Sequence, residues 1–193
     1  MSSIIEFDKQ IFSWFNSLAG TSRVLDFILK IISVYTIYLV PILFLAFWFI
    51  YRNEKTQKFL LEICITSIIS WQVIASVIGA LINRPRPSTF LGTKEIFFHP
   101  PTYSFPSDHA LFLAFLTSYL YLSGYKKMGN IALGVTILVS ISRVVAGLHW
   151  PGDILAGWIL GILLALMFFE FKKYIIKYIV NPLYYLAKLI RLV

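Results

Sequence analysis

Cysteine and charged side chains are scarce in this sequence. Cys64 is the only cysteine in the 193 residues, so a disulfide framework is excluded and the cysteine content does not indicate a redox compartment. Only 13% of the residues are charged, whereas 59% are hydrophobic. A soluble domain of this size cannot bury so much apolar surface, but a protein embedded in lipid can leave it exposed. The composition therefore predicts an integral membrane protein with a single domain, residues 1–193.

Acidic residues are also few, and the N-terminus has no signal-peptide pattern. Nine Asp and Glu residues oppose seventeen Lys and Arg residues, and the net charge is +8. Such an excess can indicate nucleic-acid binding, but here the cations are scattered among apolar segments. We therefore expect anionic lipid head groups, and no nucleic acid, as partners. The N-terminus has no basic segment followed by an apolar run and a small-residue cleavage site, so no secretory signal peptide is expected.

Long apolar runs dominate the rest of the chain. Five of them are long enough, as helices, to cross most or all of a bilayer; they lie at residues 24–51, 59–82, 107–125, 128–145 and 154–169. Residues 4–18 place apolar side chains at helical spacing with polar residues between them, which favours an amphipathic helix in the membrane interface. We therefore predict an all-α transmembrane bundle of about five spans, with this interfacial helix at the N-terminus and a basic interfacial tail from residue 171.

The cations divide unequally between the two ends of such a bundle. Ten of the seventeen fall on the end that carries the C-terminus, and three of the other seven belong to candidate motifs. Because cytoplasmic loops are enriched in lysine and arginine, we expect the C-terminus in the cytoplasm. The proline-rich connection 83–106 and the histidines His99, His109 and His149 then lie on the outer side. The predicted location is the cytoplasmic membrane, with an extracytoplasmic site.

Ionisable residues meet between the last two apolar runs. His149 and Asp153 lie between these runs, and Arg143 lies at the end of the first of them. Ionisable groups near a bilayer carry a desolvation cost, so their presence favours a functional site. The four-residue spacing of His149 and Asp153 allows the carboxylate to reach the imidazole and fix its tautomer. The alternative is that this histidine and this aspartate only cap two helices.

Two further polar segments on the same side complete a candidate anion site. One is Arg-Pro-Arg-Pro at residues 84–87, and the other is Phe-Pro-Ser-Asp-His at residues 105–109. Guanidinium groups, a hydroxyl and free backbone N–H groups at the start of a helix suit phosphate oxygens. The candidate anion ligands are Arg84, Arg86, Arg143 and Ser107. Two histidines can catalyse phosphoryl transfer together, since one can attack phosphorus while the other protonates the leaving oxygen.

In these three segments the chain resembles the type 2 phosphatidic acid phosphatase superfamily, which shares its core with vanadium haloperoxidases. The family pattern is a lysine, six residues and Arg-Pro; then Pro-Ser-Gly-His; then Ser-Arg, five residues, a histidine, three residues and an aspartate. The third part matches fully over residues 142–153, and the second matches at 106–109 except that Asp108 replaces the glycine. The first part lacks its lysine, because Gly79 stands at that distance from Arg86. The match covers residues 79–153 closely, and three ordered motifs are more specific than one.

This resemblance implies catalysis through a phosphohistidine on His149, oriented by Asp153. His109 would act first as general acid to the leaving group and then as base for the attacking water. The groups implied to hold the phosphoryl oxygens are Arg86, Arg143, Ser107 and, in place of the missing lysine, Arg84. No metal or other cofactor is implied. Histidines can also indicate zinc, but His109 and His149 have other roles in this interpretation.

The sequence Ser-Phe-Pro-Ser-Asp-His at residues 104–109 looks like that of bacterial undecaprenyl-diphosphatases of this superfamily. The predicted reaction is hydrolysis of undecaprenyl diphosphate to undecaprenyl phosphate at the outer face of the cytoplasmic membrane. Phosphatidic acid and phosphatidylglycerophosphate are alternative substrates, because the apolar spans and the arginines do not distinguish one lipid tail from another. An alternative of another class is a non-catalytic lipid-phosphate binder or transporter subunit, which would need the arginines but no nucleophile. The sequence makes no prediction of the oligomeric state.

Overall fold

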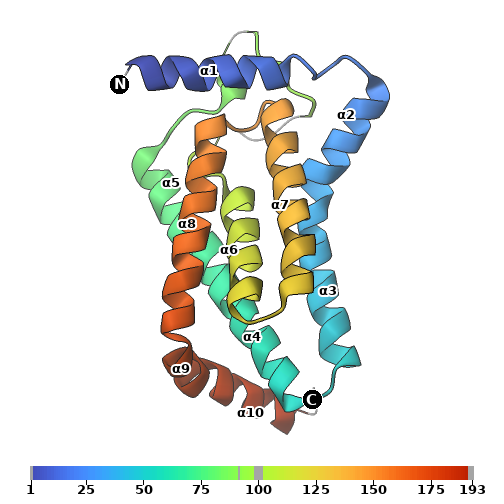
Figure 1. Cartoon of the computed structure of the whole chain (residues 1–193), viewed down its shortest axis with the longest axis vertical. Helices are drawn as coiled ribbons and strands as arrows, with labels where there is room; N and C mark the ends of the chain where they lie inside the picture. The colour runs from blue at the N-terminus through green and yellow to red at the C-terminus, as the bar shows by residue number, and fades with distance from the viewer. Residues whose placement is uncertain (1, 91, 98–101, 191–193) are drawn as a thin grey trace.

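Helices are the only regular secondary structure in the described residues. The computed structural model describes residues 2–90, 92–97 and 102–190, and these ranges contain no strand. The elements are α1 (Ser2–Asn16), α2 (Arg23–Lys30), η1 (Ile31–Tyr35), α3 (Thr36–Ile50), α4 (Glu54–Ile68), η2 (Ile69–Ala75), α5 (Ser76–Ile82), η3 (Pro87–Thr89), α6 (Asp108–Leu122), α7 (Lys126–Val145), α8 (Pro151–Glu170), α9 (Lys172–Ile175), η4 (Ile176–Val180) and α10 (Asn181–Leu189). The predicted all-α class is confirmed, and the helices form an elongated bundle (Figure 1).

Within the described ranges, four helical stretches are long and apolar enough to cross a membrane. They are Arg23–Ile50, Glu54–Thr89, Lys126–Val145 and Pro151–Glu170. The fifth predicted span, residues 107–125, contains the shorter helix α6 of 15 residues. At a rise of 1.5 Å per residue α6 is about 22 Å long, which is less than the hydrocarbon core of a bilayer. The bundle therefore has four long helices around one short central helix.

The central helix α6 is apolar on all sides because other helices enclose it. Leu111 and Tyr119 are fully buried, and α7 and α8 run alongside them (Figure 1). Two glycines allow α8 to approach closely: a Cβ at Gly157 would lie 2.8 Å from the carbonyl oxygen of Ser107, and one at Gly161 would lie 2.5 Å from that of Leu111. Small residues permit such close backbone contact in membrane bundles. The starts of α6 and α8 consequently lie side by side.

The helix α1 and the segment α9–α10 lie across opposite ends of the bundle (Figure 1). α1 crosses over the ends of α7 and α8, and it exposes Phe7 and Trp14. The turn between α3 and α4 and the turn between α6 and α7 lie at the other end, together with α9 and α10. This arrangement confirms the predicted helix at the N-terminal end and the predicted division of the basic segments from the motif segments.

Candidate functional site

The turn between α7 and α8 carries His149 at the end of the bundle that α1 covers (Figure 1). Gly147 has φ +80° there, and a Cβ at this position would lie 2.8 Å from the carbonyl oxygen of Lys94. Pro151 occupies the first turn of α8, where its missing N–H costs no hydrogen bond. The Asp153 carboxylate accepts a hydrogen bond from the backbone N–H of Trp150 at 2.9 Å. Asp153 thus caps α8, as the alternative interpretation required, and it also lies beside His149.

His149 is 1% exposed, and both of its ring nitrogens have partners. Nδ1 lies 2.8 Å from the carbonyl oxygen of Ser104. Nε2 lies 3.0 Å from Nη2 of Arg143 and 3.2 Å from Nη1 of Arg86. A carbonyl oxygen only accepts and a guanidinium only donates, so the proton is on Nδ1 and the lone pair of Nε2 points at the two arginines.

The predicted contact between Asp153 and the imidazole differs from the contact in the structure. Oδ2 of Asp153 lies 3.8 Å from Nδ1 of His149, which exceeds hydrogen-bond length. The Ser104 carbonyl makes the hydrogen bond that fixes the tautomer, and sequence motifs give no signal for a backbone acceptor of this kind. The carboxylate, which is fully buried, acts on His149 over a short distance through its charge and through the Trp150 backbone.

The pKa of His149 is lowered to about 4 from an ordinary value of 6.5. Burial is the largest cause, since it disfavours the imidazolium, and the positive charge of Arg143 adds to it. At neutral pH the imidazole is therefore uncharged, which leaves Nε2 with a lone pair. A neutral, buried nitrogen between two guanidinium groups can act as a nucleophile toward an anion that those groups hold.

Arg86 and Arg143 are held from several directions. Arg86 donates from Nη1 to the Leu148 carbonyl at 2.9 Å and from Nη2 to Oγ1 of Thr102 at 3.1 Å. Arg143 donates from Nη1 to the carbonyl oxygen of Ser33 at 3.1 Å. Ser33 lies within the π-helical turn η1, which the sequence does not predict. Both arginine side chains are buried. Their guanidinium groups therefore have fixed positions beside His149 before any ligand binds.

Two buried polar atoms of the predicted anion site lack a partner. Oγ of Ser107 and Nε of Arg143 form no hydrogen bond with any residue that the structure describes. Buried polar groups are normally paired, so each unpaired one needs an explanation. Phosphoryl oxygens would satisfy both atoms, because each of them can donate a hydrogen bond.

His109 opens α6 beside Asp108, the residue that replaces the family glycine. Oδ1 of Asp108 lies 3.0 Å from Nδ1 of His109 and 2.8 Å from its backbone nitrogen. The same oxygen lies 3.9 Å from Nη2 of Arg143. This carboxylate fixes the proton of His109 on Nδ1 and leaves Nε2 for a reacting group. Asp108 therefore supplies to His109 the kind of partner that the sequence motifs assigned only to His149.

Arg84, which the sequence predicts as a phosphate ligand, contacts two carboxylates, and its role toward phosphate stays a prediction. Nη1 donates to Asp153 at 2.7 Å and Nη2 donates to Asp8 of α1 at 2.6 Å. The guanidinium therefore contacts two carboxylates, whereas Arg86 and Arg143 contact Nε2 of His149. At Gly79, the position of the family lysine, a Cβ would overlap the ring of Tyr103. An aromatic ring fills the space where the lysine side chain would begin.

No group of three His, Cys, Asp or Glu side chains in the described part of the chain gathers in a way that could hold a metal ion. His99 lies outside the described residues, so its predicted place on the outer side stays a prediction. The site residues expected from the sequence come from the ends of α5, α6, α7 and α8. His149 contacts both Arg86 and Arg143, and Asp108 links His109 to Arg143.

Comparison with known proteins finds relatives of one family. The PAP2 superfamily profile matches residues 59–177. The chain is 34% identical over 164 residues to the undecaprenyl-diphosphatase of Sulfolobus acidocaldarius, which covers 81% of this chain and 74% of that protein. It is 30% identical over 163 residues to undecaprenyl-diphosphatase BcrC of Bacillus subtilis, covering 84% of this chain and 83% of that protein. Among solved structures it is similar to the transmembrane PAP2-type phosphatidylglycerolphosphate phosphatase of Bacillus subtilis, with a TM-score of 0.70 and 25% identity. The similarity covers 91% of this chain and 89% of that chain. The family that the three motifs predicted is confirmed, and this chain belongs to the PAP2 superfamily.

Proposed function

We propose that this protein, a membrane lipid phosphatase by its family, hydrolyses undecaprenyl diphosphate to undecaprenyl phosphate through a phosphohistidine on His149. The observation that carries the mechanism is the lone pair of Nε2, which lies between Arg86 and Arg143 in a buried site. A binding protein would need the two guanidinium groups but not a neutral imidazole nitrogen directed at them. This difference favours an enzyme over a non-catalytic lipid-phosphate binder or transporter subunit.

In the first step, Nε2 of His149 attacks the terminal phosphorus of the lipid diphosphate. The N–P bond forms as the P–O bond to the lipid phosphate breaks, and protonated His109 gives its proton to the departing oxygen. Arg86 and Arg143 exchange their contacts with Nε2 for phosphoryl oxygens, because a phosphate anion is a stronger acceptor than a neutral imidazole. The Ser104 carbonyl and the Asp153 carboxylate stabilise the positive charge that the His149 ring acquires.

In the second step, water attacks the phosphohistidine. His109, now neutral, accepts a proton from the water as the new O–P bond forms and the N–P bond to His149 breaks. Inorganic phosphate leaves, and both histidines return to their starting states. Asp108 supports this exchange of roles, because its carboxylate lies 3.0 Å from Nδ1 of His109 and leaves Nε2 available for proton transfer.

The substrate assignment is supported by the two undecaprenyl-diphosphatases of similar sequence. Phosphatidylglycerophosphate is the second candidate, because the similar solved structure is described as a phosphatidylglycerolphosphate phosphatase. Phosphatidic acid stays an alternative from the family resemblance. We further propose that no metal takes part and that the site faces the outside of the cytoplasmic membrane, since the more basic end of the bundle is the end opposite α1.

The experiment is phosphate release by purified protein in detergent, with a chelator present, from a panel of the three lipids. We expect the highest kcat/KM for undecaprenyl diphosphate and no loss of activity with the chelator. His149→Ala should lower the rate by several orders of magnitude, as for other covalent nucleophiles. Alkaline quenching during turnover should leave phosphate on His149. Phosphate on another residue, or a near wild-type rate for His149→Ala, would contradict the mechanism.

A further inference from the structure

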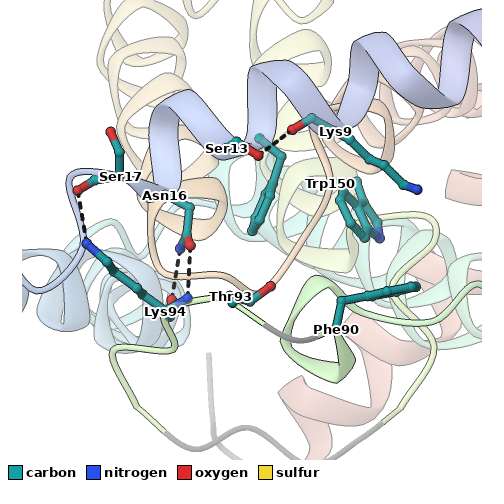
Figure 2. A pocket seen from close by; sticks show the side chains of 10 residues that line it. Lys9, Ser13, Asn16, Ser17, Phe90, Thr93, Lys94 and Trp150 are labelled. Carbon is teal, nitrogen blue, oxygen red and sulfur yellow. Dashed lines mark hydrogen bonds between the residues drawn. The ribbon is translucent and has the colours of Figure 1, made fainter.

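One face of α1 contacts the frame of the candidate site at three successive turns. Asp8, Phe12 and Asn16 are four residues apart, so they lie in one row along the helix. The Phe12 ring lies 4.9 Å from the ring of Trp150, which follows His149 directly. Asn16 donates to the carbonyl oxygen of Lys94 and accepts from the backbone N–H of the same residue (Figure 2). It also donates to the carbonyl oxygen of Val145. α1 is therefore attached to the end of α7, to the His149 turn and to the long loop.

Asp8 makes the contact closest to the catalytic groups. Its side chain is 12% exposed, and its two oxygens have different partners. Oδ2 accepts from Nη2 of Arg84 at 2.6 Å, and Oδ1 accepts from the backbone N–H of Gly152 at 2.7 Å. A Cβ at residue 152 would lie 3.1 Å from Oδ2 of Asp8, so the glycine leaves space for the carboxylate. These contacts hold Arg84 and the first turn of α8 in one arrangement.

Arg84 connects Asp8 to Asp153. Its two terminal nitrogens bind one carboxylate each, and the Asp153 carboxylate is fully buried. Without Asp8, the guanidinium would lose one of two charge-assisted hydrogen bonds and would be free to turn away from Asp153. Asp153 would then lose its charge-assisted hydrogen bond to Arg84 and keep the one from the backbone N–H of Trp150. The distance between this carboxylate and the His149 ring depends on both contacts.

We infer that Asp8 is a positioning residue for the reaction proposed above, on which this inference rests, and that α1 is part of the active site. Asp8 keeps Arg84 against Asp153, and Asp153 then stabilises the charge that develops on His149. This also accounts for the missing family lysine: Arg84 belongs to the support of the nucleophile, while Arg86 and Arg143 hold the phosphate. The exposed apolar residues of α1, Phe7 and Trp14, keep the helix in the interface where Asp8 reaches the site.

The test compares Asp8→Asn with Glu6→Gln, an equal change at an exposed position of the same helix. For Asp8→Asn we expect kcat per folded molecule to fall about 10- to 100-fold, as is typical when a supporting carboxylate is removed, with KM within twofold. Glu6→Gln should match the wild type. Arg84→Met should lose activity similarly, and the double variant Asp8→Asn/Arg84→Met should be no slower than Arg84→Met alone. An Asp8→Asn rate within twofold of Glu6→Gln, or losses that multiply in the double variant, would overturn the inference.

Orthovanadate binding separates this inference from the proposed function. Vanadate can form a bond to Nε2 of His149 and adopt the five-coordinate geometry of the transition state, whereas inorganic phosphate only occupies the anion site. By calorimetry, Asp8→Asn should bind vanadate about tenfold more weakly than Glu6→Gln while binding phosphate equally well. If the wild type hydrolyses no lipid of the panel, the proposed function fails, and this ratio still decides the role of Asp8. Equal vanadate affinities in the two variants would contradict that role.

Discussion

At the scale of single residues, the structure assigns the two nitrogens of His149 by the chemistry of their neighbours. A carbonyl oxygen faces Nδ1 and two guanidinium groups face Nε2, so only one tautomer satisfies all three partners. The sequence predicted the histidine, the aspartate and the arginines from their spacing. It could not predict the carbonyl groups of Ser104 and Ser33, because a backbone acceptor carries no residue-type signal. It also could not predict that Arg84 would bind Asp8, because 76 residues separate the two partners.

The lowered pKa of His149 predicts a pH dependence of stability. The folded protein keeps this imidazole neutral down to about pH 4, whereas the unfolded chain protonates it near pH 6.5. The unfolded state therefore binds more protons between these values, and the contribution of this group to stability decreases as the pH falls through that window. We expect the melting temperature of the wild type in detergent to fall, relative to His149→Gln, between pH 7 and pH 4.5. Parallel melting curves for the two proteins across this range would contradict the assigned shift.

Asp108 predicts a dependence on the leaving group. If its carboxylate orients His109 for proton donation, Asp108→Asn should slow only those substrates whose leaving oxygen needs a proton. We expect a loss of about tenfold with lipid phosphates and a change within twofold with p-nitrophenyl phosphate, whose leaving group departs without protonation. The measurement is kcat/KM for both substrates in the same preparation. Equal losses with both substrates would mean that Asp108 supports phosphate binding and does not orient His109 as the general acid.

At the scale of helices, hydropathy predicted where the apolar segments lie, but it did not distinguish a helix enclosed by protein from one that faces lipid. The hydropathy of residues 107–125 predicts a membrane span like the others, whereas α6 is a 15-residue helix enclosed by its neighbours. The reason is that burial by protein and burial by lipid both select apolar residues, so the two environments give the same composition. The π-helical turns at Ile31–Tyr35 and Ile69–Ala75 have no turn residues that would predict them. The helix α1 was predictable because its apolar residues recur with the period of a helix.

The close contact of α6 and α8 predicts different outcomes for two glycine substitutions. A Cβ at Gly161 would lie 2.5 Å from the carbonyl oxygen of Leu111 and 2.9 Å from the backbone nitrogen of Phe115, whereas one at Gly134 on α7 meets nothing within 4 Å. We expect Gly161→Ala to destabilise the protein by about 1–3 kcal/mol through overpacking. Gly134→Ala should be neutral or slightly stabilising, because alanine favours the helix. Thermal unfolding of both variants in detergent measures the difference, and equal melting temperatures would contradict the tight α6–α8 contact.

At the scale of the whole molecule, the two ends of the bundle have different chemistry. The helix ends that carry the motif residues lie beneath α1 (Figure 1). The starts of α4 and α7 and the segment α9–α10 carry the lysines of the other end. Near the latter end, the buried Glu62 accepts from the Tyr119 hydroxyl and lies 3.3 Å from Nζ of Lys172. This ion pair joins α9 to the bundle. Because lysines and arginines favour the cytoplasmic side, the α1 end and its catalytic groups are expected outside.

Cysteine labelling in intact cells tests this orientation. Cys64 is the only native cysteine, so Cys64→Ala gives a background in which one introduced thiol reports one position. Ser17, at the end of α1, and Lys127, in the first turn of α7, are both exposed and lie at opposite ends of the bundle. A membrane-impermeant maleimide should label Ser17→Cys in intact cells and should label Lys127→Cys only after permeabilisation. Equal labelling of both after permeabilisation is the control for access. The reverse pattern in intact cells would place the site in the cytoplasm, where a phospholipid such as phosphatidylglycerophosphate becomes the better substrate and hydrolysis of a carrier diphosphate at the outer face is ruled out.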